Sequence, residues 1–143
     1  MTVLPFVIER VYNASPEAVW SAITDKNKMK EWYFDLAEFK AEPGFEFEFT
    51  AGDDKKKYLH RCKVIEVIPI RKLSYTWSYE IVPGESLVSF ELFPEEDRTR
   101  LRLTHSGLET FKTDNTDFKP ESFEKGWSHI IGKSLKEYVE RRM

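Results

Sequence analysis

Several residue types and patterns are scarce in this chain of 143 residues. A single cysteine, Cys62, excludes an intramolecular disulfide, and six glycines with seven prolines exclude collagen-like and Pro/Gly-rich disordered chains. No run approaches the ~18 apolar residues of a transmembrane helix, and residues 1–5 lack the charged and apolar regions of a signal peptide. We therefore predict a cytoplasmic protein that does not insert into a membrane.

The chain also lacks an excess of positive charge. It carries 22 Lys and Arg against 25 Asp and Glu, for a net charge of −3 and an isoelectric point near 5.7. No global field would hold it on phosphate or on an anionic membrane. The only basic run, residues 55–57, follows Gly52-Asp53-Asp54 and is typical of a solvated hairpin tip. Nucleic acid is therefore not a predicted partner.

Catalytic and metal-binding motifs are missing as well. The sequence contains no Gly-x-Ser-x-Gly, no Gly-x-x-x-x-Gly-Lys, no Gly-x-Gly-x-x-Gly and no Cys-x-x-Cys, so hydrolase, kinase, dehydrogenase and zinc-finger functions have no support. His60 and Cys62 offer two metal ligands on one strand face, but no third is visible. We predict neither a metal nor a cofactor, and whether the protein is an enzyme stays open.

Aromatic residues, in contrast, are abundant. The chain has 21 of them, 11 Phe, 6 Tyr and 4 Trp, whereas apolar residues as a whole reach only 41% and the mean hydropathy is −0.53. The apolar mass is thus concentrated in large rings. The length corresponds to one compact core, which predicts a single domain over residues 1–143.

The middle of the chain alternates between apolar and polar residues, as strands with one buried face do. Turn signals at residues 43–44, 83–84 and 95–98 separate the alternating runs. These features predict an antiparallel meander. The runs most clearly patterned as strands are Val3–Tyr12, Phe45–Thr50, Leu73–Glu80, Val88–Leu92 and Arg100–Leu103.

Helical patterns lie towards the two ends. Ser15 before Pro16 and Glu17 is a strong helix start, and a second short helix is expected from about residue 25 to Trp32. From about Pro120 to the C-terminus, one apolar face indicates a long helix. Within it, Gly126 predicts a close approach of helix to sheet, and His129 is expected to point to solvent. The residues marking the apolar face are Phe123, Trp127, Ile130, Ile131, Ser134, Leu135 and Tyr138.

Together these elements predict an α+β fold. A curved antiparallel sheet of about six to seven strands would wrap around the long C-terminal helix, with two short helices after the first strand. Because a strongly bent sheet cannot contact a straight helix everywhere, we expect a cavity between them near one end. The predicted cavity residues are Trp32, Phe45, Phe47, Tyr75, Trp77, Phe90, His105, Trp127 and Ile131. The same pattern also fits rings that fill a core and touch one another.

Two polar residues are candidates for chemistry. His105 continues the inward phase of Leu101 and Leu103, which fits either a hydrogen-bonded core histidine or a ligand-contacting or acid/base group. In a regular strand Glu66 would face inward with His60, and burial would raise its pKa. Glu66 and His105 could then form a proton-transfer pair. The opposing observation is that Glu66 lies three residues before Pro69, where strands commonly bulge or leave the core.

Five motifs in register resemble the START-like (SRPBCC) superfamily, and specifically the domain similar to the activator of heat-shock protein 90 ATPase. The resemblance covers essentially the whole chain, with one departure at Pro43-Gly44, where many members have two glycines. The motifs are Glu9–Trp20 (ERVYNASPEAVW), Trp32, Glu66–Trp77 (EVIPIRKLSYTW), Thr104–Leu108 (THSGL) and Gly126-Trp127. The resemblance implies a helix-grip (Bet v 1-like) fold with a hydrophobic cavity, but no particular reaction.

Three functions follow from the pattern and the resemblance. We favour binding of a small hydrophobic or amphipathic molecule, because inward aromatic rows face an aromatic-bearing helix. A second hypothesis is a cofactor-independent enzyme of the cyclase or aromatase type, in which Glu66 and His105 are the weak catalytic candidates. A third, implied only by the resemblance, is a chaperone-interaction module. In that family the eukaryotic activators carry an additional N-terminal domain, for which this chain has no residues left, so we expect no ATPase stimulation.

Overall fold

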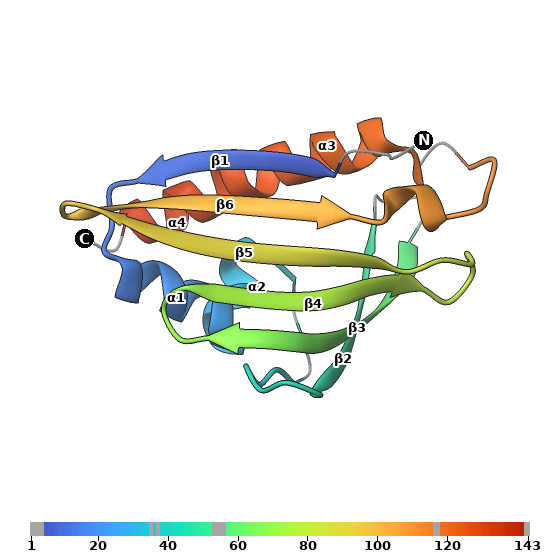
Figure 1. The fold of residues 1–143 in the computed structure, drawn as a ribbon, viewed down its shortest axis with the longest axis horizontal. Helices are drawn as coiled ribbons and strands as arrows, with labels where there is room; N and C mark the ends of the chain where they lie inside the picture. Colours follow the sequence, from blue (N-terminus) through green and yellow to red (C-terminus); the bar gives the residue numbers. More distant parts are fainter. Residues whose placement is uncertain (1–4, 35, 37, 53–56, 116–117, 142–143) are drawn as a thin grey trace.

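The computed structural model describes residues 5–34, 36, 38–52, 57–115 and 118–141. Residues 53–56 of the predicted hairpin tip and the start of the first predicted strand lie outside these residues. Figure 1 shows a curved sheet with the C-terminal helix running along one of its faces. In chain order the elements are β1 (Phe6–Tyr12), α1 (Pro16–Thr24), α2 (Lys26–Trp32), β2 (Glu46–Gly52), β3 (Lys57–Ile68), β4 (Lys72–Tyr79), β5 (Ser86–Glu95), β6 (Arg98–Ser106), the 3-10 turn η1 (Leu108–Thr110), α3 (Pro120–His129), the π-helical segment η3 (Ile130–Ser134) and α4 (Leu135–Arg141).

The six strands form one antiparallel sheet in the order β1-β6-β5-β4-β3-β2. The helices α1 and α2 pack against α4 at one end of the sheet, and the C-terminal helix runs beside β1 (Figure 1). The predicted α+β architecture is thereby confirmed. The face of the sheet towards the helices, the inner face, is buried, whereas the outer face is largely polar.

The two short helices begin where their caps predict. The Ser15 hydroxyl accepts a hydrogen bond from the Ala18 amide at 3.1 Å, and Pro16 occupies the first turn of α1. The Asp25 carboxylate accepts from the Asn27 amide at 2.9 Å and so caps α2. A single residue thus ends one helix and starts the next, which fixes the direction of α2 and the position of the aromatic residues that follow it.

An irregularity in β3 changes which residues face inward. Val64 pairs with Tyr75, but Glu66 pairs with Ser74, so Ile65 is an extra residue in this strand. Ile65 and Glu66 are both exposed as a result. The bulge ends the inward alternation of His60, Cys62 and Val64 before it reaches Glu66.

The C-terminal helix contains a π-helical segment at its centre. The Leu135 amide donates to the Ile130 carbonyl, five residues earlier, and the Tyr12 hydroxyl donates to the Ile131 carbonyl at 2.6 Å. Here the helix lies close to β1. A Cβ atom added to Gly132 would lie only 3.4 Å from Arg10 Nε. The predicted close approach at Gly126 is wrong: this residue is exposed and a Cβ there would meet nothing within 4 Å.

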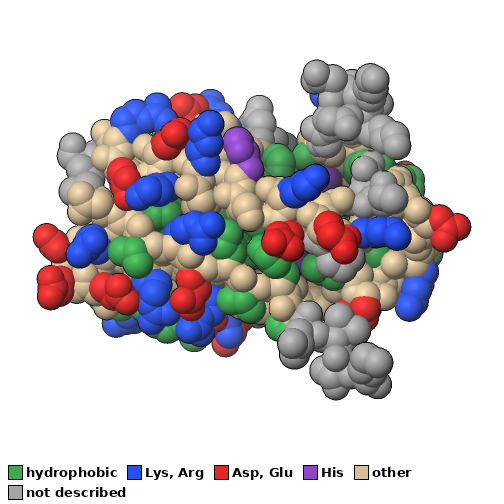
Figure 2. All heavy atoms as spheres, turned by 90° about the horizontal axis from the view of Figure 1, so that it is seen from above, with side chains coloured by type: hydrophobic (Ala, Val, Ile, Leu, Met, Phe, Trp, Pro, Cys, Tyr) green, Lys and Arg blue, Asp and Glu red, His purple; other side chains and the backbone are tan. Residues whose placement is uncertain are grey.

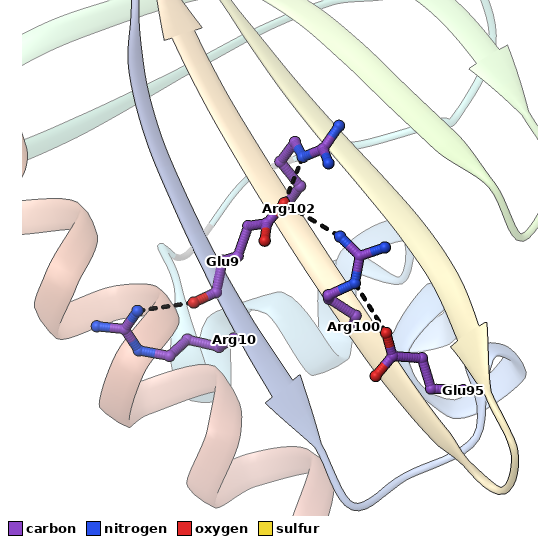
Figure 3. A network of polar contacts seen from close by, with 5 residues as sticks. All are labelled: Glu9, Arg10, Glu95, Arg100 and Arg102. Atoms are coloured by element: carbon purple, nitrogen blue, oxygen red, sulfur yellow. Dashed lines mark hydrogen bonds and ion pairs between the residues drawn. The ribbon is translucent and has the colours of Figure 1, made fainter.

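The outer face near β1 and β6 carries a network of ion pairs (Figure 3). Glu9 pairs with both Arg100 and Arg102, and Arg100 also pairs with Glu95 at 2.9 Å. The hydrogen bond from Arg102 lowers the pKa of Glu9. Both guanidinium groups lie over the ring of Phe93, at 4.5 and 5.0 Å from its centroid. The charges in this network are therefore paired with one another.

Charge is distributed without a single-sign patch on the face seen in Figure 2, where Lys and Arg alternate with Asp and Glu around scattered hydrophobic side chains. A field of this kind offers no basic track for a phosphate backbone on that face. Among the described residues, no helix is both long and apolar enough to cross a membrane.

Candidate functional site

The inner face of the sheet carries a group of aromatic rings that touch one another. Alternation along β2, β3 and β4 places every second side chain on this face. The closest ring centroids lie 4.4 Å apart, between Tyr33 and Phe34 and between Phe34 and Phe49. Trp77 connects the sheet to the helix, with its ring 5.5 Å from that of Trp127. We call this group the inner aromatic cluster: Tyr33, Phe34, Phe47, Phe49, His60, Tyr75, Trp77, Phe90, His105 and Trp127.

The structure brings most of the predicted cavity residues together. Phe47, Tyr75, Trp77, Phe90, His105 and Trp127 belong to the inner aromatic cluster, and all are buried. Ile131 is fully buried on the same helix face, one turn beyond Trp127. Trp32 is buried beside the cluster, stacked on Tyr33 at 4.9 Å, and Phe45 is only partly buried, against Phe39. That these residues line a cavity stays a prediction.

His105 lies in a closed hydrogen-bond network. The Trp127 indole N–H donates to His105 Nδ1 at 2.9 Å, so the neutral ring carries its proton on Nε2. Nε2 lies 2.7 Å from the Ser86 hydroxyl, which donates onward to the Trp77 carbonyl at 2.9 Å. Burial lowers the pKa of His105 to about 3, and protonation at Nδ1 would set two donors against each other. His105 is therefore held neutral by the fold.

His60 is a second neutral, buried histidine. Its ring stacks on Phe49 at 4.6 Å and meets the edge of Trp77 at 5.0 Å, while Nδ1 lies 2.9 Å from the Tyr58 carbonyl. Burial lowers its pKa to about 4, opposed in part by that hydrogen bond. Burial likewise raises the pKa of the Cys62 thiol well above its usual value. Neither group carries charge near neutral pH.

Tyr33 and Tyr75 bring two hydroxyls to the same point. Their oxygens lie 2.6 Å apart, although the residues are 42 positions apart in the chain. Tyr75 is fully buried, and Tyr33, which directly follows α2, is half-buried. Burial raises the pKa of both phenols well above the usual value, so both keep their protons.

The predicted proton-transfer pair is not formed. Glu66 is exposed and makes an ion pair with Lys72 at 3.0 Å, because the bulge at Ile65 turns it away from the interior. Both ring nitrogens of His105 are occupied by Trp127 and Ser86. The structure therefore separates the two weak catalytic candidates, with Glu66 on the surface and His105 in the core.

Metal ligands do not converge among the described residues: no three His, Cys, Asp or Glu side chains there could hold an ion. His60 and Cys62 share the inner face of β3, where both are buried. His129 is exposed, as the helix periodicity predicted.

Sequence reasoning missed three residues that matter for the site. Tyr33 and Phe34 follow Trp32 directly, so three consecutive aromatic residues at the end of a short helix were the signal that could have found them. Ser86 carries no such signal, because its role depends on the pairing of β5 with β4 and β6.

The curved antiparallel sheet around a long C-terminal helix defines a helix-grip protein. The chain belongs to the family of activator of Hsp90 ATPase homolog 1-like proteins, whose sequence model matches residues 13–140. Among curated proteins, none matches the chain.

Solved structures support the same fold. Protein CV1439 from Chromobacterium violaceum is 23% identical, with a TM-score of 0.79 over 95% of this chain and 96% of that one. Protein BH1534 from Bacillus halodurans is 27% identical, with a TM-score of 0.76 over 98% of this chain and 100% of that one. DynU16, a protein in the dynemicin biosynthetic locus, is 21% identical, with a TM-score of 0.78 over 97% of this chain and 48% of that one. For CV1439 and DynU16, the likeness shows the fold alone.

Proposed function

We propose that this protein binds a small hydrophobic or amphipathic molecule between the inner face of the sheet and the C-terminal helix. The observation that carries the proposal is the inner aromatic cluster, which combines large apolar rings with a few fixed polar atoms. Small-molecule sites commonly have this composition, with apolar walls and a small number of polar groups that fix orientation. The occurrence of the same fold in DynU16, a protein in a biosynthetic locus, is compatible with it.

A hollow on the outer face is an alternative location, and its lining suits an apolar guest less well. It measures about 650 Å³ beside β2, β3 and β4, and charged side chains make up much of its lining. Arg61, which lines it, is already paired with Glu48 at 3.2 Å and with Glu80 at 3.1 Å. An apolar guest would have to cover these ion pairs, whereas the inner face offers it aromatic rings.

Binding without turnover is the simpler form of the proposal. The cyclase-like alternative needs a group that exchanges a proton near neutral pH. Of the two predicted candidates, Glu66 faces solvent and His105 is held neutral. The chaperone-interaction alternative rests on the family's description, and we expect no stimulation of a purified Hsp90 ATPase. The predicted cytoplasmic location stays a prediction.

Titration with the neutral fluorophore N-phenyl-1-naphthylamine, followed by fluorescence and by NMR of the tryptophan indole N–H groups, tests the proposal. We expect saturable binding of one probe per chain and shifts of the Trp77 and Trp127 indole signals. Trp20, on α1 and outside the inner aromatic cluster, is the internal control and should not shift. Tryptophan-to-phenylalanine variants would assign the signals.

Two results would contradict the proposal. One is the lack of saturable binding, and the other is binding that shifts Trp20 but leaves Trp77 and Trp127 unchanged. Native mass spectrometry of gently purified protein complements the titration, because a retained molecule would reveal its mass directly.

A further inference from the structure

The hydroxyl groups of Tyr33 and Tyr75 leave one proton without an acceptor among the residues that the structure describes. The two oxygens are 2.6 Å apart and either can be the donor. Each phenol carries one proton, so one hydroxyl donates to the other and the second proton must find a partner elsewhere. No further hydrogen bond to either hydroxyl exists within the described part of the chain. The pair is therefore one acceptor short.

The pair lies among aromatic rings, with Tyr75 buried and Tyr33 half-buried. Tyr75 is 0% exposed, and its ring packs against Phe47 at 5.1 Å and Phe90 at 5.9 Å. The Tyr33 ring lies nearly parallel to that of Trp127, with 6.3 Å between centroids. Buried donors in folded proteins are almost always paired, which makes a spare one in an aromatic interior informative.

The surroundings define what could accept the proton. Both phenols stay protonated, and the neighbouring Cys62 and His60 are neutral near pH 7. A guest carboxylate would be buried here without a cation from these groups, which is unfavourable. A neutral carbonyl oxygen needs no counter-charge and accepts one O–H donor in its plane. Aromatic walls favour a flat, cyclic body for the rest of the guest.

We propose that the Tyr33 and Tyr75 hydroxyl pair is a polar anchor that donates a hydrogen bond to the neutral carbonyl oxygen of a flat, cyclic apolar molecule. This inference rests on the proposed function and deepens it, because it names the chemical class of the guest and the atoms that orient it.

The test uses two molecules of nearly the same shape, 1-indanone and indane, which differ by one carbonyl oxygen. Dissociation constants are measured for both by following the indole N–H signals of Trp77 and Trp127. We expect both molecules to bind the unmodified protein and 1-indanone to bind about tenfold more tightly, which corresponds to about 1.4 kcal/mol.

Variants then locate the preference. In the double variant Tyr33→Phe/Tyr75→Phe the ratio of the two dissociation constants should fall close to one, with indane affinity unchanged. Single variants should keep part of the preference, because either remaining hydroxyl can turn to the guest. Tyr12→Phe is the matched control: it removes another buried hydroxyl, bonded to the Ile131 carbonyl, and should keep the tenfold ratio.

The outcomes separate the two proposals. If neither molecule binds, the proposed function fails and the anchor with it. If both bind the unmodified protein with equal affinity, binding stands but the anchor is wrong, and this result requires no variant. If the double variant keeps the tenfold preference, the carbonyl is recognised elsewhere and the anchor is also wrong.

Discussion

The two polar groups among the inner aromatic rings, the His105 network and the Tyr33 and Tyr75 pair, differ in how completely their hydrogen bonds are made. The His105 network is closed, since Trp127, His105, Ser86 and the Trp77 carbonyl form a chain in which every proton has an acceptor. The Tyr33 and Tyr75 pair is open, because two donors share one hydrogen bond. Both lie among the same aromatic rings. Completeness of hydrogen bonding, rather than burial or residue type, therefore separates a structural polar group from a candidate recognition group in this interior.

Lowering the pH should reduce the free energy of unfolding more than any other change proposed below, because it protonates His105 in the closed network and also the buried His60. The folded-state pKa of His105 is about 3 and that of His60 about 4, whereas an ordinary histidine titrates near 6.5. Below pH 6.5 the unfolded chain binds these protons and the folded protein does not, so stability is fully present above 6.5 and falls as pH drops. Each histidine contributes a slope of about 1.4 kcal/mol per pH unit down to its folded pKa.

Urea unfolding between pH 7.5 and 4.5 measures this loss, and several kcal/mol in total are expected. His60→Phe, which keeps a ring on Phe49, should roughly halve the slope contributed by the two histidines. A stability that is independent of pH between 6.5 and 5 would show that neither histidine is held neutral.

Trp127→Phe should destabilise the protein by about 2–3 kcal/mol. It removes the donor to His105 Nδ1 and part of a ring that is 3% exposed. With Nδ1 free to accept a proton, the pKa of His105 should rise, which NMR titration of the histidine ring detects. A loss of stability without any rise in this pKa would mean that only packing had changed.

Removing one hydroxyl from each group compares them directly. Ser86→Ala leaves the His105 Nε2 proton without its acceptor, so the free energy of unfolding should fall by about 1–3 kcal/mol. Tyr75→Phe removes a group that is not fully bonded and should cost less than Ser86→Ala by about 1 kcal/mol. Equal losses in urea denaturation would contradict the distinction between closed and open groups.

Glu66→Gln should have the smallest effect. Its carboxylate pairs with Lys72 on the surface, with 46% of the side chain exposed, and exposed ion pairs contribute about 1 kcal/mol or less. Binding of 1-indanone and indane should not change. A loss of binding in this variant would indicate that Glu66 takes part in the site after all.

Much of the fold could be predicted from local patterns. The alternation of Phe47 and Phe49 places both rings inward, and Ser15 with Pro16 predicts the start of α1. These features depend on residues close together in the chain, where side-chain periodicity and capping chemistry act directly. The long C-terminal helix is confirmed for the same reason.

The features that sequence reasoning missed depend on distant partners. A bulge before Pro69 was one of the two alternatives for Glu66, but its position at Ile65 follows from how β3 pairs with β4. The Tyr33 hydroxyl meets Tyr75 across 42 positions, and Ser86 meets His105 across 19. Gly126 was expected to mark a close approach, but that approach occurs at Gly132, where the π-helical segment and Arg10 meet. Periodicity along one element contains no information on such pairings.

The π-helical segment also explains a spacing in the C-terminal helix. Five residues placed four apart are all buried: Phe123, Trp127, Ile131, Leu135 and Val139. In a uniform α-helix of 3.6 residues per turn, each step of four advances about 40° beyond a full turn, so four steps would rotate the last residue about 160° away from the first. The wider turn over Ile130–Ser134 takes back part of this rotation. One helix thereby keeps a four-residue repeat against the sheet. Because the wider turn accommodates one residue more than an α-helical turn, deletion of one residue in that segment would restore a regular α-helix and leave Leu135 and Val139 facing the sheet.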